Sequence, residues 1–163
     1  MSRVSWIKEP TRIMDDSNPP FIRWFTDGTL NFAYNCIERH LEKGAERIAL
    51  IYESPITGKS GQMTYGELHV QVERFSTVLA NQGVKKGNRV IIYMPMILES
   101  AVVMLACARI GAIHSVVFGG FAAKELASRI KDSQASLIVS ASCGIEPHKV
   151  IDYRKLIDDS KAI

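Results

Sequence analysis

The run from Arg89 to Phe121 constrains the fold more than any other part of the sequence. It begins with the strand-like Val90–Tyr93, continues through a helix-like segment at 99–110, and ends in the strand-like His114–Phe118 followed by Gly119-Gly120. Two apolar β-branched runs on either side of a helix predict a β-α-β unit with parallel strands. Ligands of open α/β sheets bind beyond the carboxyl ends of the strands, and glycine lets backbone approach a ligand closely. The glycine pair is therefore the first candidate for a binding site.

Strand-like and helix-like segments alternate along the rest of the chain. The sequence predicts helices over 31–43, 64–82 and 123–131, and strands over 48–52, near 62–63 and over 136–140. Thr64 and Glu67 form a capping box that starts the second of these helices, and 57–61 reads as a hairpin tip. The expected fold class is α/β, a β-hairpin plus parallel β-α-β units joined by right-handed crossovers. We expect 142–149 to form a loop at the same sheet edge as the glycine pair.

The amino-terminal residues 1–30 differ from the remainder in composition. They carry several prolines and bulky aromatic residues without a sustained period: Pro10, Pro19, Pro20, Phe21, Trp24 and Phe25. We expect an extended arm that packs its aromatic side chains on one domain, residues 31–163, since a chain of 163 residues suffices for about one domain. No targeting segment is visible, which indicates the cytoplasm, with the mitochondrial matrix as the alternative if a presequence has been lost.

Charge and residue spacing argue against several classes of function. The net charge of +3 is spread along the chain, so we expect neither nucleic acid nor a membrane surface as a partner. The apolar stretch 96–118 is interrupted by Glu99, Arg109 and His114, which indicates a buried helix and strand rather than a membrane span. The four histidines lack ligand spacing, so no metal site is expected. The three widely spaced cysteines read as reduced thiols.

Two glycine motifs are weak matches to phosphate-binding signatures. Gly58-Lys59-Ser60 resembles the end of a P-loop, but Glu53 stands where that motif requires glycine. Gly119-Gly120 lacks the third glycine of a dinucleotide fingerprint, which argues against a hydride-transfer cofactor and against a flavodoxin-like nucleotide-binding module. The glycine pair could equally serve only a tight turn, and Lys149, at the same predicted sheet edge, could be an ordinary solvated lysine.

Longer segments resemble one family over nearly the whole chain. The sequence is similar to the amino-terminal part of short-chain, AMP-forming acyl-CoA synthetases, in the segments 24–31, 63–68, 93–96 and, most specifically, 104–121. The residues Cys143–Pro147 resemble the propionyl-CoA synthetase branch more than acetyl-CoA synthetase. The resemblance implies the amino-terminal part of an adenylate-forming ligase domain with an incomplete sheet.

The resemblance also implies a reaction and a binding site. In the family, a carboxylate attacks the α-phosphate of ATP with Mg²⁺ present, and the thiol of coenzyme A (CoA) then displaces AMP from the acyl-adenylate. The family's contacts to the phosphorylated end of CoA correspond here to a tetrad, Glu146, Pro147, His148 and Lys149. The turn matching Phe118, Gly119 and Gly120 borders the same site. Acetyl-type members carry two arginines across the tetrad, whereas Glu146 and Lys149 stand here, and lysine binds phosphate as a point charge only.

The family's catalytic motifs correspond to positions beyond Ile163. The ATP phosphate loop, the adenylation motif, the acyl pocket and the mobile carboxyl-terminal domain are all expected there, so no residue of this chain is assigned as catalytic or as a metal ligand. We therefore expect the chain alone to be inactive, contributing scaffold and part of a CoA site and able to pair with the remainder of a ligase. The alternative is a non-catalytic truncated product or interaction module.

Overall fold

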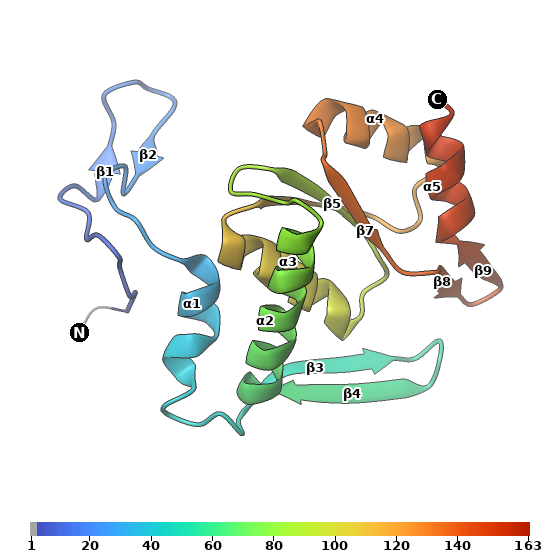
Figure 1. Ribbon diagram of the computed structural model, residues 1–163, viewed down its shortest axis with the longest axis horizontal. Coiled ribbons are helices and arrows are strands. Elements are labelled where there is room, and N and C mark those ends of the chain that lie inside the picture. The colour runs from blue at the N-terminus through green and yellow to red at the C-terminus, as the bar shows by residue number, and fades with distance from the viewer. Residues whose placement is uncertain (1–2) are drawn as a thin grey trace.

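Helices and strands alternate along the computed structural model, which describes residues 3–163 (Figure 1). In chain order the elements are β1 (Met14–Asp15), β2 (Arg23–Trp24), α1 (Phe32–Cys36), the 3₁₀ helix η1 (Glu38–His40), β3 (Ile48–Ser54), β4 (Lys59–Thr64), α2 (Tyr65–Asn81), β5 (Arg89–Tyr93), α3 (Leu98–Ile110), β6 (Ile113–Val117), α4 (Ala123–Ser133), β7 (Leu137–Ser140), β8 (Cys143–Glu146), β9 (Lys149–Asp152) and α5 (Tyr153–Lys161).

The three predicted strands of the β-α-β units form one parallel sheet with β5 in the centre. The strand order is β6-β5-β7, and both neighbours run parallel to β5. The side chains of Val90, Ile91, Ile92 and Tyr93 are all fully buried, as expected for a strand covered on both faces and bounded by two others. The parallel sheet predicted from the sequence is confirmed, and the carboxyl ends of all three strands lie at one edge.

Each face of the sheet carries its own hydrophobic cluster. Alternate β5 residues point to opposite faces, so Val90 and Ile92 pack with side chains of α2 and α3, while Ile91 and Tyr93 pack with side chains of α4 and α5. Figure 1 shows α4 and α5 side by side at one end of the molecule, away from α2. Among the described residues, no helix is long and apolar enough to cross a membrane.

The predicted capping box joins the antiparallel β3–β4 hairpin to α2. The Thr64 hydroxyl accepts a hydrogen bond from the backbone N–H of Glu67 at 3.2 Å, and the Glu67 carboxylate accepts one from the backbone N–H of Thr64 at 2.8 Å. These bonds satisfy two backbone donors that the first turn of a helix leaves without partners.

Replacing Thr64 with alanine should therefore lower the free energy of unfolding by about 1 kcal/mol. Thr77→Ala is the matched control, because the Thr77 hydroxyl lies exposed within α2 and donates only to the Glu73 carbonyl at 3.1 Å. This control should change stability by less than about 0.5 kcal/mol. Urea denaturation measures both values, and equal losses in the two variants would contradict the capping role.

Two predicted elements differ from the structure. The helix expected over 31–43 breaks at Ile37, whose backbone φ of −124° and ψ of −74° separates α1 from η1. The Ile37 side chain is fully buried in the hydrophobic cluster that includes the apolar face of α2. The helix is therefore interrupted at the residue that packs into this cluster. The prediction of a loop over 142–149 is wrong, because β8 and β9 pair antiparallel there, with Glu146 opposite Lys149. The helix α5, which follows β9, was not predicted.

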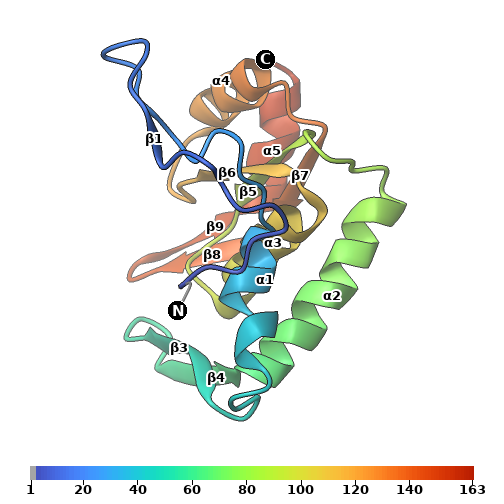
Figure 2. The same cartoon turned by 90° about the vertical axis from the view of Figure 1, so that its left-hand side faces the viewer.

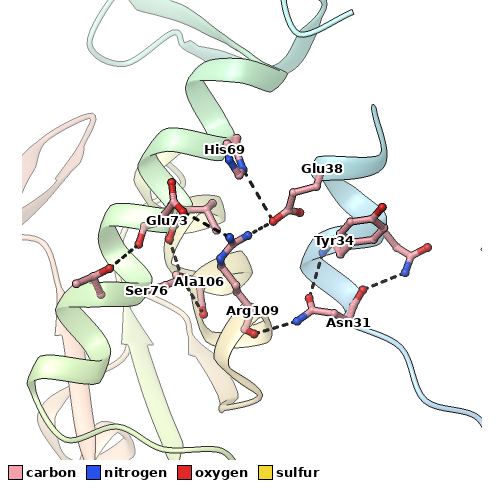
Figure 3. A network of polar contacts seen from close by, with 11 residues as sticks. Asn31, Tyr34, Glu38, His69, Glu73, Ser76, Ala106 and Arg109 are labelled. Atoms are coloured by element: carbon pink, nitrogen blue, oxygen red, sulfur yellow. Dashed lines mark hydrogen bonds and ion pairs between the residues drawn. The ribbon is translucent and has the colours of Figure 1, made fainter. Parts of the chain in front are cut away.

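A polar network attaches α1 and η1 to α2 and α3 (Figure 3). The Arg109 guanidinium forms an ion pair with the Glu38 carboxylate and lies 3.8 Å from a carboxylate oxygen of Glu73. Asn31, which caps α1 through the Tyr34 N–H, also donates to the Arg109 carbonyl at 3.0 Å. The Glu38 side chain is only 16% exposed, so Arg109 supplies the cation that this buried carboxylate requires.

The amino-terminal arm does not pack its aromatic side chains on the domain as predicted. The segment around β1 and β2 projects from the rest of the chain in both views (Figures 1 and 2). Trp24 is 59% exposed, and the ring of Phe25 contacts Trp6 and Trp24 at centroid distances of 5.4 and 6.5 Å. None of these rings belongs to either hydrophobic cluster described above. Trp6, Trp24 and Phe25 pack on one another instead, and Phe21 is 72% exposed.

Cys107 is fully buried under α2, and burial raises the pKa of its thiol to about 11. The thiolate is the reactive form of cysteine, so Cys107 in the folded chain should resist alkylation by iodoacetamide at pH 8. The half-buried Cys143 is the internal control and should react first. Peptide mass spectrometry with and without urea measures both. Equal modification of the two cysteines in the folded chain would contradict the prediction.

Candidate functional site

The connections that follow β5 and β6 run to opposite faces of the sheet. The chain leaves β5 into α3, which covers one face, and leaves β6 into α4, which covers the other. Adjacent parallel strands whose connections diverge in this way open a crevice beyond their carboxyl ends, where α/β proteins bind ligands. The turn 118–122 follows β6 and therefore lies at this carboxyl edge, where the sequence places the glycine pair.

The residues of this turn differ in their accessibility. Phe118 is 70% exposed, Gly119 is buried and Gly120 is exposed. The Tyr93 hydroxyl at the end of β5 donates to the Phe121 carbonyl at 2.8 Å and lies 3.3 Å from the Gly119 carbonyl oxygen. The turn is therefore fixed to the central strand, and of the three predicted site residues in it Phe118 and Gly120 are exposed.

The predicted tetrad forms the tip of the β8–β9 hairpin. Glu146 is the last residue of β8, Lys149 the first of β9, and Pro147 and His148 make the turn between them. The Lys149 ammonium lies 3.3 Å from a Glu146 carboxylate oxygen, and the two side chains are 64% and 41% exposed. Lys149 is thus accessible to an anion, but a carboxylate already neutralises part of its charge.

Tyr153 brings the base of this hairpin to the β6–α4 turn. A Cβ atom at Gly119 or at Gly144 would lie 2.8 Å from the Tyr153 ring carbon Cζ and would overlap the hydroxyl. Both glycines are required because the phenol fills the space that a side chain would occupy. A Cβ at Gly120 would likewise lie 2.6 Å from the Phe118 ring. The glycine pair therefore accommodates aromatic side chains of the chain itself.

Burial raises the pKa of both phenols at this edge. Tyr93 is fully buried, and the neighbouring Tyr153 raises its pKa further. For Tyr153 the Glu146 carboxylate adds to the effect of burial, which places that carboxylate within electrostatic reach of the phenol. Both hydroxyl groups remain protonated at neutral pH and can donate hydrogen bonds.

A separate cavity of about 370 Å³ lies beyond the carboxyl ends of β5 and β7. The β3–β4 hairpin forms its other wall, and none of the seven predicted site residues lines it. Glu53 is its single charged lining residue, so it does not suit a phosphate group. Within residues 3–163, no group of His, Cys, Asp or Glu side chains is arranged to hold a metal ion.

Comparison with known protein families gives the class of protein to which this fold belongs. Residues 37–162 match the family described as AMP-binding enzyme, and residues 1–36 match the family described as acetyl-coenzyme A synthetase N-terminus. The chain belongs to the AMP-binding enzyme family.

Individual relatives narrow this class to the short-chain synthetases. The chain is 53% identical over 157 residues to an acetyl-coenzyme A synthetase of Methylobacillus flagellatus, with 96% of this chain covered. It is 47% identical over 162 residues to the mitochondrial acyl-CoA synthetase short-chain family member 3 of Mus musculus, with 99% covered. It covers 24% of the length of either relative.

A solved structure agrees with these sequence relatives. The acetoacetyl-CoA synthetase from Streptomyces lividans superposes on 98% of this chain with a TM-score of 0.88 at 25% sequence identity. This chain again covers 24% of that protein. The predicted fold, the amino-terminal part of an acyl-CoA synthetase, is confirmed.

Proposed function

We propose that this chain is the amino-terminal part of a short-chain carboxylate–CoA ligase and forms one wall of its CoA site. The reaction consumes a short-chain carboxylate such as propionate or acetate, ATP and CoA, and it releases acyl-CoA, AMP and pyrophosphate. The relatives named acetyl-coenzyme A synthetase and acyl-CoA synthetase short-chain family member 3 support this assignment. We place the ATP, Mg²⁺ and acyl sites outside this chain, and the reaction in the cytoplasm, with the mitochondrial matrix as the alternative.

The single observation that carries the proposed CoA wall is that buried Tyr153 contacts both halves of it. It meets Gly119, which follows the exposed Phe118, and Gly144, in the hairpin whose tip carries the exposed Lys149. Phe118 offers a flat apolar surface to an adenine ring, and Lys149 offers positive charge to a phosphate. Pro147, His148 and Gly120 complete the accessible surface, with Glu146 beside the cation. Gly119 contributes through the backbone of the turn.

NMR titration of the ¹⁵N-labelled chain with CoA tests this proposal. We expect the amide resonances of Phe118, Gly120 and the hairpin tip to shift. Dephospho-CoA, which lacks one phosphate, should bind more weakly, because Lys149 would then lose a charge partner. Millimolar CoA that leaves all of these resonances unchanged would overturn the proposed site.

Two substitutions at the hairpin tip should act in opposite directions. Lys149→Gln should weaken CoA binding about fivefold, because it removes a cation from the phosphate. Glu146→Gln should strengthen it, because it removes the competing carboxylate. The matched control is Lys161→Gln: Lys161 is also 64% exposed and pairs with the carboxylate three residues before it, Asp158, at 3.0 Å. Equal effects of the two lysine substitutions would argue for non-specific attraction.

The chain by itself should not form acyl-CoA. We propose this because the family's catalytic motifs match no segment here. A coupled assay of AMP release with ATP, Mg²⁺, CoA and acetate or propionate measures it. Turnover that co-purifies with the chain and disappears in the Ile92→Ala variant described below would contradict the prediction.

The open edge of the sheet favours a second candidate, an interaction module. In the part of the chain that the structure describes, no strand pairs with the outer edge of β6. Ile113 and Val116 on that strand are 55% and 50% exposed, and an apolar open edge favours pairing with another chain. The proposed partner is the complementary part of a ligase. Ligase activity that appears only when such a complement is mixed with this chain would support it.

A further inference from the structure

We infer that Tyr153 is the positioning residue of the proposed CoA wall: it fixes the β8–β9 hairpin against the β6–α4 turn. The inference rests on the proposed function for its ligand, but its structural part stands on contacts within the chain. Tyr153 is 3% exposed and does not itself face a ligand.

Backbone hydrogen bonds do not hold the two halves of this wall together. Within the described residues, β8 and β9 form a sheet of their own, separate from β6-β5-β7. Gly119 and Gly144 are 25 positions apart in the sequence, and the phenol of Tyr153 fills the space at both. A side chain therefore sets the position of the hairpin relative to the turn.

Contacts of both the side chain and the backbone fix the position of Tyr153. Its ring packs on the ring of Tyr93, with centroids 4.7 Å apart and an angle of 38° between the planes. Its backbone N–H donates to the Ser142 carbonyl at 3.1 Å, and Asp152 caps α5 by accepting from the Lys155 N–H at 3.0 Å. The Tyr93 hydroxyl also forms hydrogen bonds with backbone carbonyls of the β6–α4 turn. The two tyrosines therefore link the central strand, this turn and the hairpin.

Gly144→Ala tests the link, because the new methyl group overlaps the phenol and must displace it. In the ¹⁵N-labelled chain we expect this substitution to shift the amide resonances of residues 119–121, far away in the sequence. Gly61→Ala is the matched control: Gly61 also lies in a hairpin strand, but a Cβ there would meet only Leu98 Cδ1, at an ordinary 3.8 Å. Shifts confined to residues 142–153 in the Gly144→Ala chain would overturn the inference.

A milder substitution covers the case in which Gly144→Ala fails to fold. Tyr153→Phe removes the hydroxyl and keeps the ring, and it should shift the resonances of both Gly119 and Gly144. A shift at one of them alone would overturn the inference. In a Tyr153→Leu background the overlap disappears, so adding Gly144→Ala should no longer disturb residues 119–121.

CoA affinity separates a positioning role from a merely structural one. At a temperature where every variant is fully folded, Gly144→Ala should weaken CoA binding about fivefold, while Gly61→Ala leaves it within about twofold. An unchanged affinity in the Gly144→Ala chain would overturn the positioning role. Absence of CoA binding by the unmodified chain would instead overturn the proposed function, and the link between hairpin and turn would still be decided by the resonances.

Discussion

Replacing Ile92 with alanine should strongly destabilise this chain, with an expected loss of about 2–5 kcal/mol in the free energy of unfolding. Ile92 is fully buried in the central strand, with Val116 and Val139 as its partners on the two neighbouring strands. Because strands flank it on both sides and helices cover it, the surroundings cannot collapse into the cavity that the substitution leaves.

Ile113→Ala is the matched control for this truncation. It removes the same atoms from the adjacent strand β6, where the side chain is 55% exposed, and should cost less than about 1 kcal/mol. Urea denaturation followed by far-ultraviolet circular dichroism gives both values. Similar losses in the two variants would show that the sheet edge is buried in solution and would contradict the described exposure.

Replacing Arg109 with methionine should have the second large effect. We expect it to lower the free energy of unfolding by about 2 kcal/mol at neutral pH. The substitution keeps much of the aliphatic packing but leaves the Glu38 carboxylate, which is 16% exposed, without its cation. Glu73, whose carboxylate oxygen lies 3.8 Å from the same guanidinium, would lose this cation as well. The double variant Arg109→Met/Glu38→Gln should recover about half of the loss, because the charge without a partner is removed as well.

An exposed ion pair serves as the control for this substitution. Arg12→Met breaks a pair with Asp16 whose two side chains are each 58% exposed, and it should change stability by less than about 0.5 kcal/mol. Urea denaturation again measures the variants. A loss in Arg109→Met no larger than in Arg12→Met, or no recovery in the double variant, would show that the network does not stabilise the attachment of α1 and η1.

The sequence was sufficient to predict the elements whose pattern is local. The β-branched run Val90–Ile92 and the capping box at Thr64 and Glu67 carry their signal within a few residues, and the structure confirms both. The helix at 31–43 was predicted too long, because the burial that accompanies the break at Ile37 depends on contacts with α2. The predicted packing of the arm on the domain was also wrong. Whether an aromatic residue is buried depends on contacts with distant parts of the chain, which the local sequence does not show.

The place of the glycine pair in the fold was predictable, but the structure around it was not. Parallel strands placed the glycine pair at the carboxyl edge, yet the hairpin at 143–152 was missed because Gly144 and Pro147 read as loop residues. Tyr93 and Tyr153 were missed because their role depends on a contact between distant parts of the chain. The signal available in the sequence was the β-branched pair Val150-Ile151 followed by Asp152 before a helix start, which favours a strand and a cap.

The division of the core into two clusters sets an order in which the chain can assemble during synthesis. The fully buried members of the cluster on the α2–α3 face all fall between Ile37 and Ala112, whereas the cluster on the α4–α5 face needs Val117, Leu126 and finally Tyr153. A ribosome therefore supplies every buried member of the first cluster some 40 residues before Tyr153, and only the partly buried Leu137 and Val139 join that cluster later. Through that interval the nascent chain presents Ile91 and Tyr93 to solvent, and this is the stage at which we expect it to depend most on a chaperone.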